Sequence, residues 1–360
     1  MTATARETVL FVALPTTTGG SPRSLVQLLA AAGGRVRRVL AAPAGSWSAT
    51  TAAERGIADD HVDIAGQERV RLHRAVVAAG LARWAVRRRR ELLAVHANGL
   101  PELLVAAPAA VLAWRPLVVW SHDPSLTRWT KLLVPVAGRL PGVRFAAVSE
   151  SSRSMLVDEA RVPARRVRVV PNPISDDVVA GPSHRAATGD GRVTVGYVGL
   201  AQHRKGFDLL PAIVERLAGA PVRVVVHANE EDSPEAWHRL LAIADPVVEA
   251  RGLVDDVRVA YGACDIVLVP SRVESFGLVA AEALLNGLPV VAADVPSLHE
   301  VVGDAGLFFA QEDVAGAADA VRRLVADPAL RAELGAAGRA RASTYAADAV
   351  ADQLLALYRA

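Results

Sequence analysis

The chain has 360 residues, which is enough for two domains of ordinary size, each with its own core. Its apolar content of 52% does not indicate a membrane-spanning protein, because no uncharged run reaches the 18 residues of a spanning helix. A single cysteine excludes an internal disulfide and, together with an N-terminus that has no signal-peptide architecture, predicts a cytoplasmic protein.

The net charge of +2 hides a division between the two halves of the chain. Residues 1–175 carry 24 Arg and Lys against 12 Asp and Glu, whereas residues 176–360 carry 16 against 26. The basic half suits an anionic acceptor or peripheral contact with an anionic membrane surface. Its densest cluster of positive charge is Arg87 to Arg90, which follows Trp84 in the sequence. A solvated arginine face explains that cluster equally well, and we expect no nucleic-acid partner.

Strand-like and helical segments alternate through the first 175 residues, as in a doubly wound α/β domain. Helices are predicted at 25–32, 69–90 and 103–114. Strands are predicted at 8–14, 36–42, 92–96, 117–120, 143–148 and 167–170.

The alternation of strands and helices is interrupted by a turn at Pro171-Asn172-Pro173. A new strand, which again ends in a glycine, begins at residue 193. We therefore predict a Rossmann-like N-terminal domain at 1–175 and a second Rossmann-like domain at 193–344. A linker rich in Gly, Pro, Ser, Asp and Thr at 176–192 joins them, and a terminal helix lies within 345–360.

Two glutamates, Glu274 and Glu282, bracket a turn between a predicted strand at 265–270 and a predicted helix at 277–286. Glu274 is expected on the loop, where it would hold a sugar, and Glu282 in the helix, where it could accept both hydrogen bonds of a ribose diol. Backbone N–H groups at the start of the helix can bind hydroxyl or diphosphate oxygens, and they belong to Ser275, Phe276, Gly277 and Leu278. A solvated helix face is the alternative, but ligands of α/β folds bind at the carboxyl ends of such strands.

The sequence of this segment, PSRVESFGLVAAEA followed by NGLPVV, resembles the signature of the retaining glycosyltransferases of the GT-B fold, specifically glycosyltransferase family 4. The resemblance continues through residues 300–302 and 305–309. It implies an α/β architecture of two Rossmann-like domains that face each other across a cleft. The first domain would bind the acceptor and the second the nucleotide sugar, and the terminal helix would cross back to the first domain.

The segment from Gly199 to Gly206 resembles the phosphate loop of this family. Lys205, one of only two lysines in the chain, matches the lysine that neutralises the departing diphosphate. Leu200 stands where the family commonly has an arginine, and the adjacent Arg204 could replace it with bidentate phosphate contacts. A solvated basic turn is the alternative.

Weaker resemblances complete the predicted site. Gly19 and Gly20 resemble the family's glycine-rich loop, whose backbone N–H groups face the donor phosphates and acceptor. Gly252 is a further expected donor contact. His122 resembles the family histidine that reaches the transferred sugar, although it could instead cap a turn with Asp123.

The resemblance implies metal-independent sugar transfer, with retention of configuration, from a UDP- or GDP-linked donor to a hydroxyl acceptor that is a small molecule or lipid-linked. No cofactor other than the donor is expected. The acidic pair Asp176-Asp177 lies on the predicted linker and lacks the strand-end setting of a metal site. A sugar-nucleotide 2-epimerase of the same fold and a non-catalytic sugar-nucleotide-binding module are the alternatives.

Overall fold

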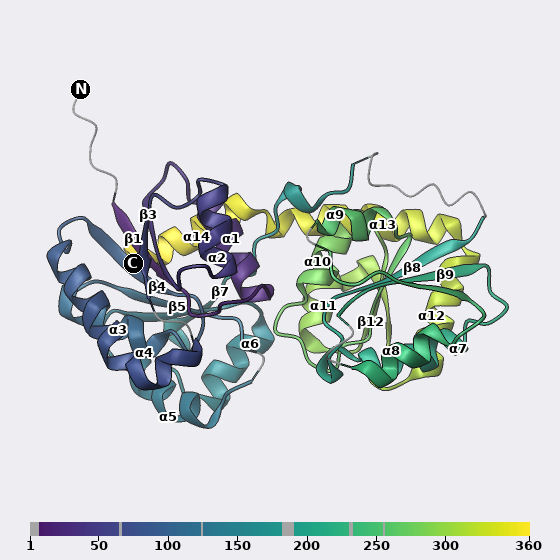
Figure 1. Cartoon of the computed structure of the whole chain (residues 1–360), viewed down its shortest axis with the longest axis horizontal. Coiled ribbons are helices and arrows are strands. Elements are labelled where there is room, and N and C mark those ends of the chain that lie inside the picture. The colour runs from purple at the N-terminus through teal and green to yellow at the C-terminus, as the bar shows by residue number, and fades with distance from the viewer. Residues whose placement is uncertain (1–6, 65–66, 124, 182–190, 230–232, 255) are drawn as a thin grey trace. The chain divides into compact units, whose positions relative to one another are not determined.

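A computed structural model describes residues 7–64, 67–123, 125–181, 191–229, 233–254 and 256–360. For residues 67–73 it describes the backbone only. The chain divides into two compact units (Figure 1). The first comprises residues 1–173 and 346–360, and the second comprises residues 174–345.

The described part of the first unit is built on a seven-stranded parallel sheet with the order β3-β2-β1-β4-β5-β6-β7. In chain order the strands are Thr8–Val12 (β1), Arg37–Ala42 (β2), Asp60–Asp63 (β3), Leu92–Ala97 (β4), Leu117–Ser121 (β5), Val143–Ala147 (β6) and Val167–Val169 (β7). The helices are Gly20–Ala31 (α1), Trp47–Glu54 (α2), Gln67–Arg87 (α3), Leu103–Ala113 (α4), Arg128–Ala137 (α5), Glu150–Ser154 (α6) and Ala347–Arg359 (α14), with a π turn at Met155–Glu159 and a 3-10 turn at Ala164–Arg166.

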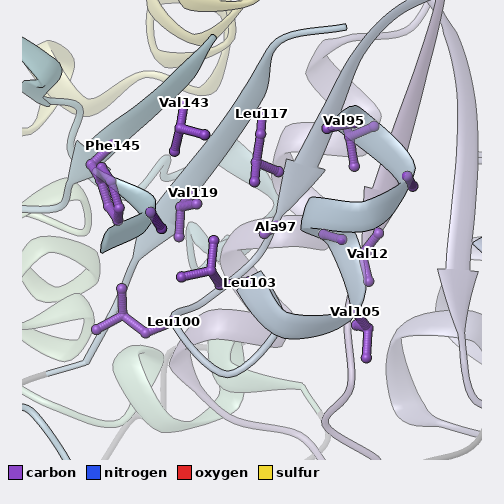
Figure 2. Close-up of a cluster of buried hydrophobic side chains, with 14 of the residues drawn as sticks. Val12, Val95, Ala97, Leu100, Leu103, Val105, Leu117, Val119, Val143 and Phe145 are labelled. Atoms are coloured by element: carbon purple, nitrogen blue, oxygen red, sulfur yellow. The ribbon is translucent and has the colours of Figure 1, made fainter. Parts of the chain in front are cut away.

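The core of the first unit lies between this sheet and the helices that cover it. The strands are short apolar runs because helices bury both faces of a parallel sheet. Figure 2 shows side chains of β4, β5 and β6 meeting those of α4, with Val95, Val119, Phe145 and Val105 fully buried.

The C-terminal helix α14 lies in the first unit, although it follows the whole of the second unit in sequence (Figure 1). Its Tyr358 hydroxyl hydrogen-bonds Nδ1 of His96 at 2.8 Å, and both residues are buried. Near the start of the helix, Arg35 of the first unit forms ion pairs with Asp348 and Asp352.

The described part of the second unit is built on a six-stranded parallel sheet with the order β10-β9-β8-β11-β12-β13. Its strands are Val193–Val198 (β8), Val222–His227 (β9), Val247–Ala250 (β10), Ile266–Val269 (β11), Val290–Ala293 (β12) and Gly306–Phe309 (β13). Its helices are Leu210–Glu215 (α7), Pro234–Leu241 (α8), Val257–Gly262 (α9), Leu278–Leu285 (α10), Pro296–Val302 (α11), Val314–Ala326 (α12) and Pro328–Ala342 (α13). Short 3-10 turns are Asp176–Val178, His203–Lys205, Phe207–Leu209, Gly303–Ala305 and Ser343–Tyr345.

The structure corrects several predicted boundaries. Helix α3 ends at Arg87, so the last three arginines of the predicted basic helix lie in the turn that follows it. After the predicted phosphate loop, the chain forms a 3-10 turn at Phe207–Leu209 and then the short helix α7. Residues 182–190 of the predicted linker lie outside the described residues, and 174–181 belong to the second unit.

Candidate functional site

The predicted motifs of the second unit come together at the topological switch point of its sheet. Strand β8 lies next to β11, and the chain runs from β8 to β9 on the opposite side. The loop from Gly199 to Gly206 follows β8, and the loop from Pro270 to Gly277 follows β11. Open parallel sheets bind ligands in the crevice that forms where two such loops diverge.

Gly206 allows these two loops to touch. Its φ of 68° is left-handed, and a Cβ atom there would lie 1.9 Å from the carbonyl oxygen of Pro270. A side chain at this position would therefore force the loops apart. Lys205, the preceding residue, is placed directly beside the β11 loop as a result.

Lys205 and Glu274 form an ion pair in which Nζ lies 2.5 Å from Oε1. The Ser271 hydroxyl donates to the same carboxylate oxygen at 3.0 Å. The Glu274 side chain is 8% exposed and the Lys205 side chain 20% exposed, so both charges are mostly shielded from water. The structure thus brings together the two residues that the sequence assigned to the diphosphate and to the sugar.

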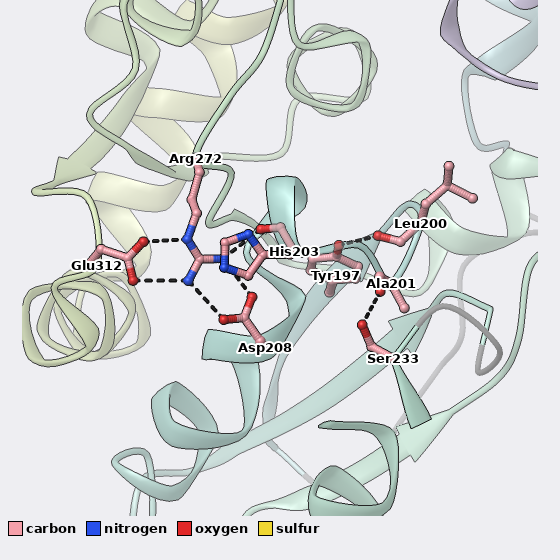
Figure 3. Close-up of polar contacts among 8 residues, drawn as sticks. All are labelled: Tyr197, Leu200, Ala201, His203, Asp208, Ser233, Arg272 and Glu312. Atoms are coloured by element: carbon pink, nitrogen blue, oxygen red, sulfur yellow. Dashed lines mark hydrogen bonds and ion pairs between the residues drawn. The ribbon is translucent and has the colours of Figure 1, made fainter. Parts of the chain in front are cut away.

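Arg272 ties both loops to the surrounding structure (Figure 3). Its guanidinium donates to both carboxylate oxygens of Asp208, at 2.6 and 2.8 Å, and to Glu312 on the other side. It also donates to the backbone oxygen of His203 at 2.6 Å. The sequence does not single out Arg272, although this residue lies within the glutamate motif. Its two carboxylate partners are distant in sequence, so only the fold reveals its role as a positioning residue.

Glu282 is fully buried in the second turn of α10. The buried Tyr261 of α9 donates a hydrogen bond from its hydroxyl to Oε2 of Glu282 at 2.6 Å. This bond fixes the carboxylate from the protein side. The sequence does not reveal this role of Tyr261, because a strand and a loop separate α9 from α10.

The start of α10 is shaped by Gly277. Its φ is 101°, and a Cβ atom there would lie 2.6 Å from Cδ2 of Leu298. Ser297 of α11 donates to the backbone oxygen of Glu274 at 2.9 Å, which holds the loop against the next helix. The predicted backbone donors at 275–278 lie at this N-terminus.

The remaining predicted donor contacts of this unit lie at the same edge of the sheet. Gly199 follows β8, and its N–H donates to the backbone oxygen of His227 at 2.9 Å. Gly252 lies just beyond β10. The Arg204 side chain is exposed and donates to Gln202 at 2.9 Å, so its guanidinium is oriented by its own turn.

In the first unit, His122 lies directly after β5 with its ring 4.5 Å from that of Trp120. Both ring nitrogens are buried and have no hydrogen-bond partner among the described residues. Burial and the neighbouring His96 lower the pKa of His122 to about 3, while the Asn172 side chain acts in the opposite direction. His122 is therefore neutral at physiological pH, and the Asn172 side chain is its polar neighbour.

Two carboxyl groups lie at this end of the first sheet. Glu102 is buried, and its Oε1 accepts from the Leu14 N–H at 3.1 Å. Burial raises the pKa of Glu102 to about 7, and the charge of Asp123 contributes in the same direction. Asp123 accepts from the Leu100 N–H at 3.3 Å. The sequence does not mark Glu102 as a site residue, because a single glutamate at the start of an apolar helix belongs to no motif.

The predicted glycine loop begins α1. Gly19 precedes the helix and Gly20 is its first residue. The next residue, Ser21, exchanges hydrogen bonds with Asn98 beyond β4, including one from Nδ2 to the hydroxyl at 2.8 Å. The loop is thus fixed at the switch point between β1 and β4. Over the described ranges of the chain, no three His, Cys, Asp or Glu residues cluster as metal ligands.

Comparison with known proteins places this architecture in a family. Residues 19–178 match the family described as Glycosyltransferase Family 4, and residues 192–327 match Glycosyl transferases group 1. The chain belongs to glycosyltransferase family 4. Its GT-B fold is shared by Anabaena HepE, solved with UDP and glucose, which aligns with a TM-score of 0.83 at 22% identity over 97% of this chain and 98% of that one. Sucrose-phosphate synthase of Thermosynechococcus elongatus aligns with a TM-score of 0.75 at 19% identity, covering 98% of each chain.

Curated relatives of this family 4 chain are D-inositol 3-phosphate glycosyltransferases. The protein of Stackebrandtia nassauensis is 34% identical over 231 residues, which cover 58% of this chain and 52% of that protein. The protein of Xylanimonas cellulosilytica is 39% identical over 175 residues, which cover 45% of this chain and 41% of that protein. The chain therefore spans about half the length of the curated relatives it matches.

Proposed function

We propose that this protein is a retaining glycosyltransferase that moves a sugar from a nucleoside diphosphate sugar to a hydroxyl group. The observation that carries the proposal is the Lys205–Glu274 ion pair, supported by Ser271, at the switch point of the second sheet. A shielded cation beside a carboxylate suits a ligand with a diphosphate next to a polyhydroxylated ring.

Each part of the donor has a proposed partner in the second unit. Lys205 and Arg204 bind the diphosphate, together with the backbone N–H groups at the start of α10. Glu274 accepts hydrogen bonds from the sugar hydroxyls, and Glu282, oriented by Tyr261, accepts those of the ribose. Gly199 and Gly252 let the backbone approach the ligand closely, since both have positive φ.

The transfer step requires that a C–O bond forms and another breaks at the anomeric carbon. The acceptor oxygen attacks from the face that the diphosphate leaves, and a diphosphate oxygen takes the acceptor proton. Lys205 stabilises the negative charge that grows on the leaving oxygen, which favours the transition state over the bound donor. We propose that this cation makes a divalent metal unnecessary, so that transfer persists in EDTA.

The first unit is the proposed acceptor domain. Its loops after β1, β4 and β5 carry the Gly19-Gly20 turn and the neutral His122, which donates to or accepts from a hydroxyl without changing charge. Its excess of cations suits an anionic acceptor. A phosphorylated polyol such as D-inositol 3-phosphate, named in the relatives, is therefore the first acceptor to test.

Mass spectrometry and NMR spectroscopy on a panel of UDP- and GDP-linked sugars, with D-inositol 3-phosphate and simple polyols as acceptors, test the proposal. The mass identifies a glycosylated acceptor, and NMR identifies the anomeric configuration and any isomerised donor. We expect a glycosylated acceptor, an α-linked product from an α-linked donor, and the same yield in EDTA. An isomerised donor would instead identify a 2-epimerase, and donor binding without any product would identify a binding module. Loss of transfer in EDTA that Mg²⁺ restores would contradict metal independence alone.

A further inference from the structure

Helix α5 of the first unit presents apolar side chains to solvent. Trp129, Leu132 and Val136 are 67%, 63% and 62% exposed, and Leu140 follows beyond the helix at 38%. Their spacing of three, four and four residues places them in one stripe. The opposite side of the helix supplies Val134 to the core. The helix thus carries apolar side chains on its exposed side as well as on its buried side.

The charged residues of α5 and of the turn after it are all cationic. Arg128, Lys131 and Arg139 are exposed on α5 and the turn after it. Residues 124–149 contain no Asp or Glu, whereas the chain as a whole has nearly as many acids as bases. We call Trp129, Leu132, Val136 and Leu140 with these three cations the α5 face.

A second exposed tryptophan lies next to the end of this face. Trp114 is 88% exposed in the turn before β5, and Arg115 follows it. The Leu117 N–H donates to the backbone oxygen of Gly142 at 2.9 Å, which joins the turn before β5 to the turn before β6. Leu140 lies in that second turn, so the turn that carries Trp114 adjoins the turn that carries Leu140 at the amino ends of β5 and β6.

We propose that the α5 face docks the protein on an anionic lipid bilayer. Tryptophan and aliphatic side chains flanked by Arg and Lys are the composition of a helix that lies in the membrane interface, where the cations meet lipid phosphates. A protein partner would need a complementary acidic surface. No helix in the described parts of the chain is long and apolar enough to span a bilayer, so this contact would lie at the membrane surface.

The arginine cluster at the end of α3 differs from the α5 face. Trp84 packs against the core, and the Arg88 guanidinium lies 4.8 Å above its ring. The tryptophan there is already engaged within the protein. The cluster can add charge near a membrane, but the groups that would insert are those of the α5 face.

Sedimentation with vesicles of phosphatidylcholine, with and without phosphatidylglycerol, tests the proposal. We expect the parent to bind only the anionic vesicles and to be released by salt, because exposed charges are screened over roughly 10 Å at 0.1 M. Trp129→Ser with Leu132→Ser and Val136→Ser should weaken binding about tenfold or more. Arg128→Glu with Lys131→Glu and Arg139→Glu should weaken it by at least about 100-fold.

The matched control is Val76→Ser with Leu241→Ser, which removes apolar groups of similar exposure from α3 and α8 and should leave binding unchanged. Thermal unfolding of all variants confirms that they fold. A parent that does not bind anionic vesicles, or a serine variant that binds like the parent, would overturn the proposal. So would a parent dimer that the serine variant dissociates, since the face would then cover a second copy. The vesicle assay contains no donor, so its failure would leave the proposed sugar transfer untouched.

Discussion

At the scale of single residues, burial sets the protonation of the first unit's polar side chains. Burial lowers the pKa of His96 and of His122 to about 3, so both rings stay neutral well below their usual range. Burial has the opposite effect on Glu102, whose pKa rises to about 7. Near neutral pH this unit therefore contains neutral histidines beside a carboxyl group that titrates.

Glu102→Gln should change how stability depends on pH. The folded-state pKa of about 7 lies above the ordinary 4.5, so protonated Glu102 contributes stability that is fully present below pH 4.5 and lost as the pH rises to 7. A glutamine cannot ionise, so the variant should gain up to about 3 kcal/mol relative to the parent between pH 4.5 and 8. Urea unfolding at both pH values measures this gain. Glu54→Gln, at an exposed position, is the control, and its difference in unfolding free energy from the parent should not depend on pH. A difference for Glu102→Gln that also does not depend on pH would contradict the raised pKa of Glu102.

Candidate site residues could be named from the sequence only where they belong to a contiguous motif. Glu274, Glu282 and Lys205 were identified from spacing and resemblance, and the structure places Lys205 against Glu274. Tyr261 and Arg272 were not identified, because their function depends on hydrogen bonds to residues that are distant in sequence. Such pairings arise from the fold and leave no local pattern.

At the scale of elements, the site depends on how closely two loops approach. The loop after β8 touches the loop after β11 only because residue 206 has no side chain. Arg272 then joins the pair to Asp208 and Glu312. The rigid ends of two neighbouring strands thus position the ion pair.

Gly206→Ala should disrupt this arrangement. Its Cβ would collide with the Pro270 carbonyl, and displacement of Lys205 by about 1 Å is expected to reduce kcat/KM on the order of 10²-fold. Gly219→Ala is a matched control, since Gly219 has a similar φ of 75° and open space around it. It should cost about 1–2 kcal/mol of stability and leave kcat/KM unchanged. Equal kinetics for the two variants would contradict the role of Gly206.

Element prediction succeeded where apolar runs are clear and failed where they are not. Strands such as β1, β5 and β11 were predicted because they are buried on both faces. Strand β3, with the sequence DHVD, is a mostly exposed edge strand and has no such run. Helix α5 contains Pro135, which is uncommon inside a helix, and it carries apolar residues on its solvent side. Neither its sequence nor its burial therefore follows the usual pattern by which a helix is predicted.

At the scale of the whole molecule, the chain forms its first unit from two separate segments. Helix α14 contributes buried side chains that include Leu354 and Tyr358, so the first unit is complete only after the second has been synthesised. The amphipathic pattern of residues 347–359 predicts a helix, but its partner could be inferred only from the family resemblance.

Tyr358→Phe should destabilise the first unit by about 1–3 kcal/mol. The change removes the 2.8 Å hydrogen bond and leaves Nδ1 of the buried His96 without a partner. Arg359→Ala, on the same helix, breaks only an exposed ion pair with Glu7 and should change stability by less than about 1 kcal/mol. Denaturant unfolding of the two variants and the parent measures both losses, and similar losses would show that the hydrogen bond contributes little.

The central claim is that Lys205 serves the departure of a diphosphate. The measurement that tests it most directly is the single-turnover rate of sugar transfer by Lys205→Ala, with donor affinity measured by calorimetry on the same sample. The control is Arg239→Ala, which removes an exposed cation of the second unit. We predict a loss of at least about 10²-fold in rate, on the order of 2.7 kcal/mol, and a much smaller loss in donor affinity. A Lys205→Ala rate within a few fold of the parent would contradict the account.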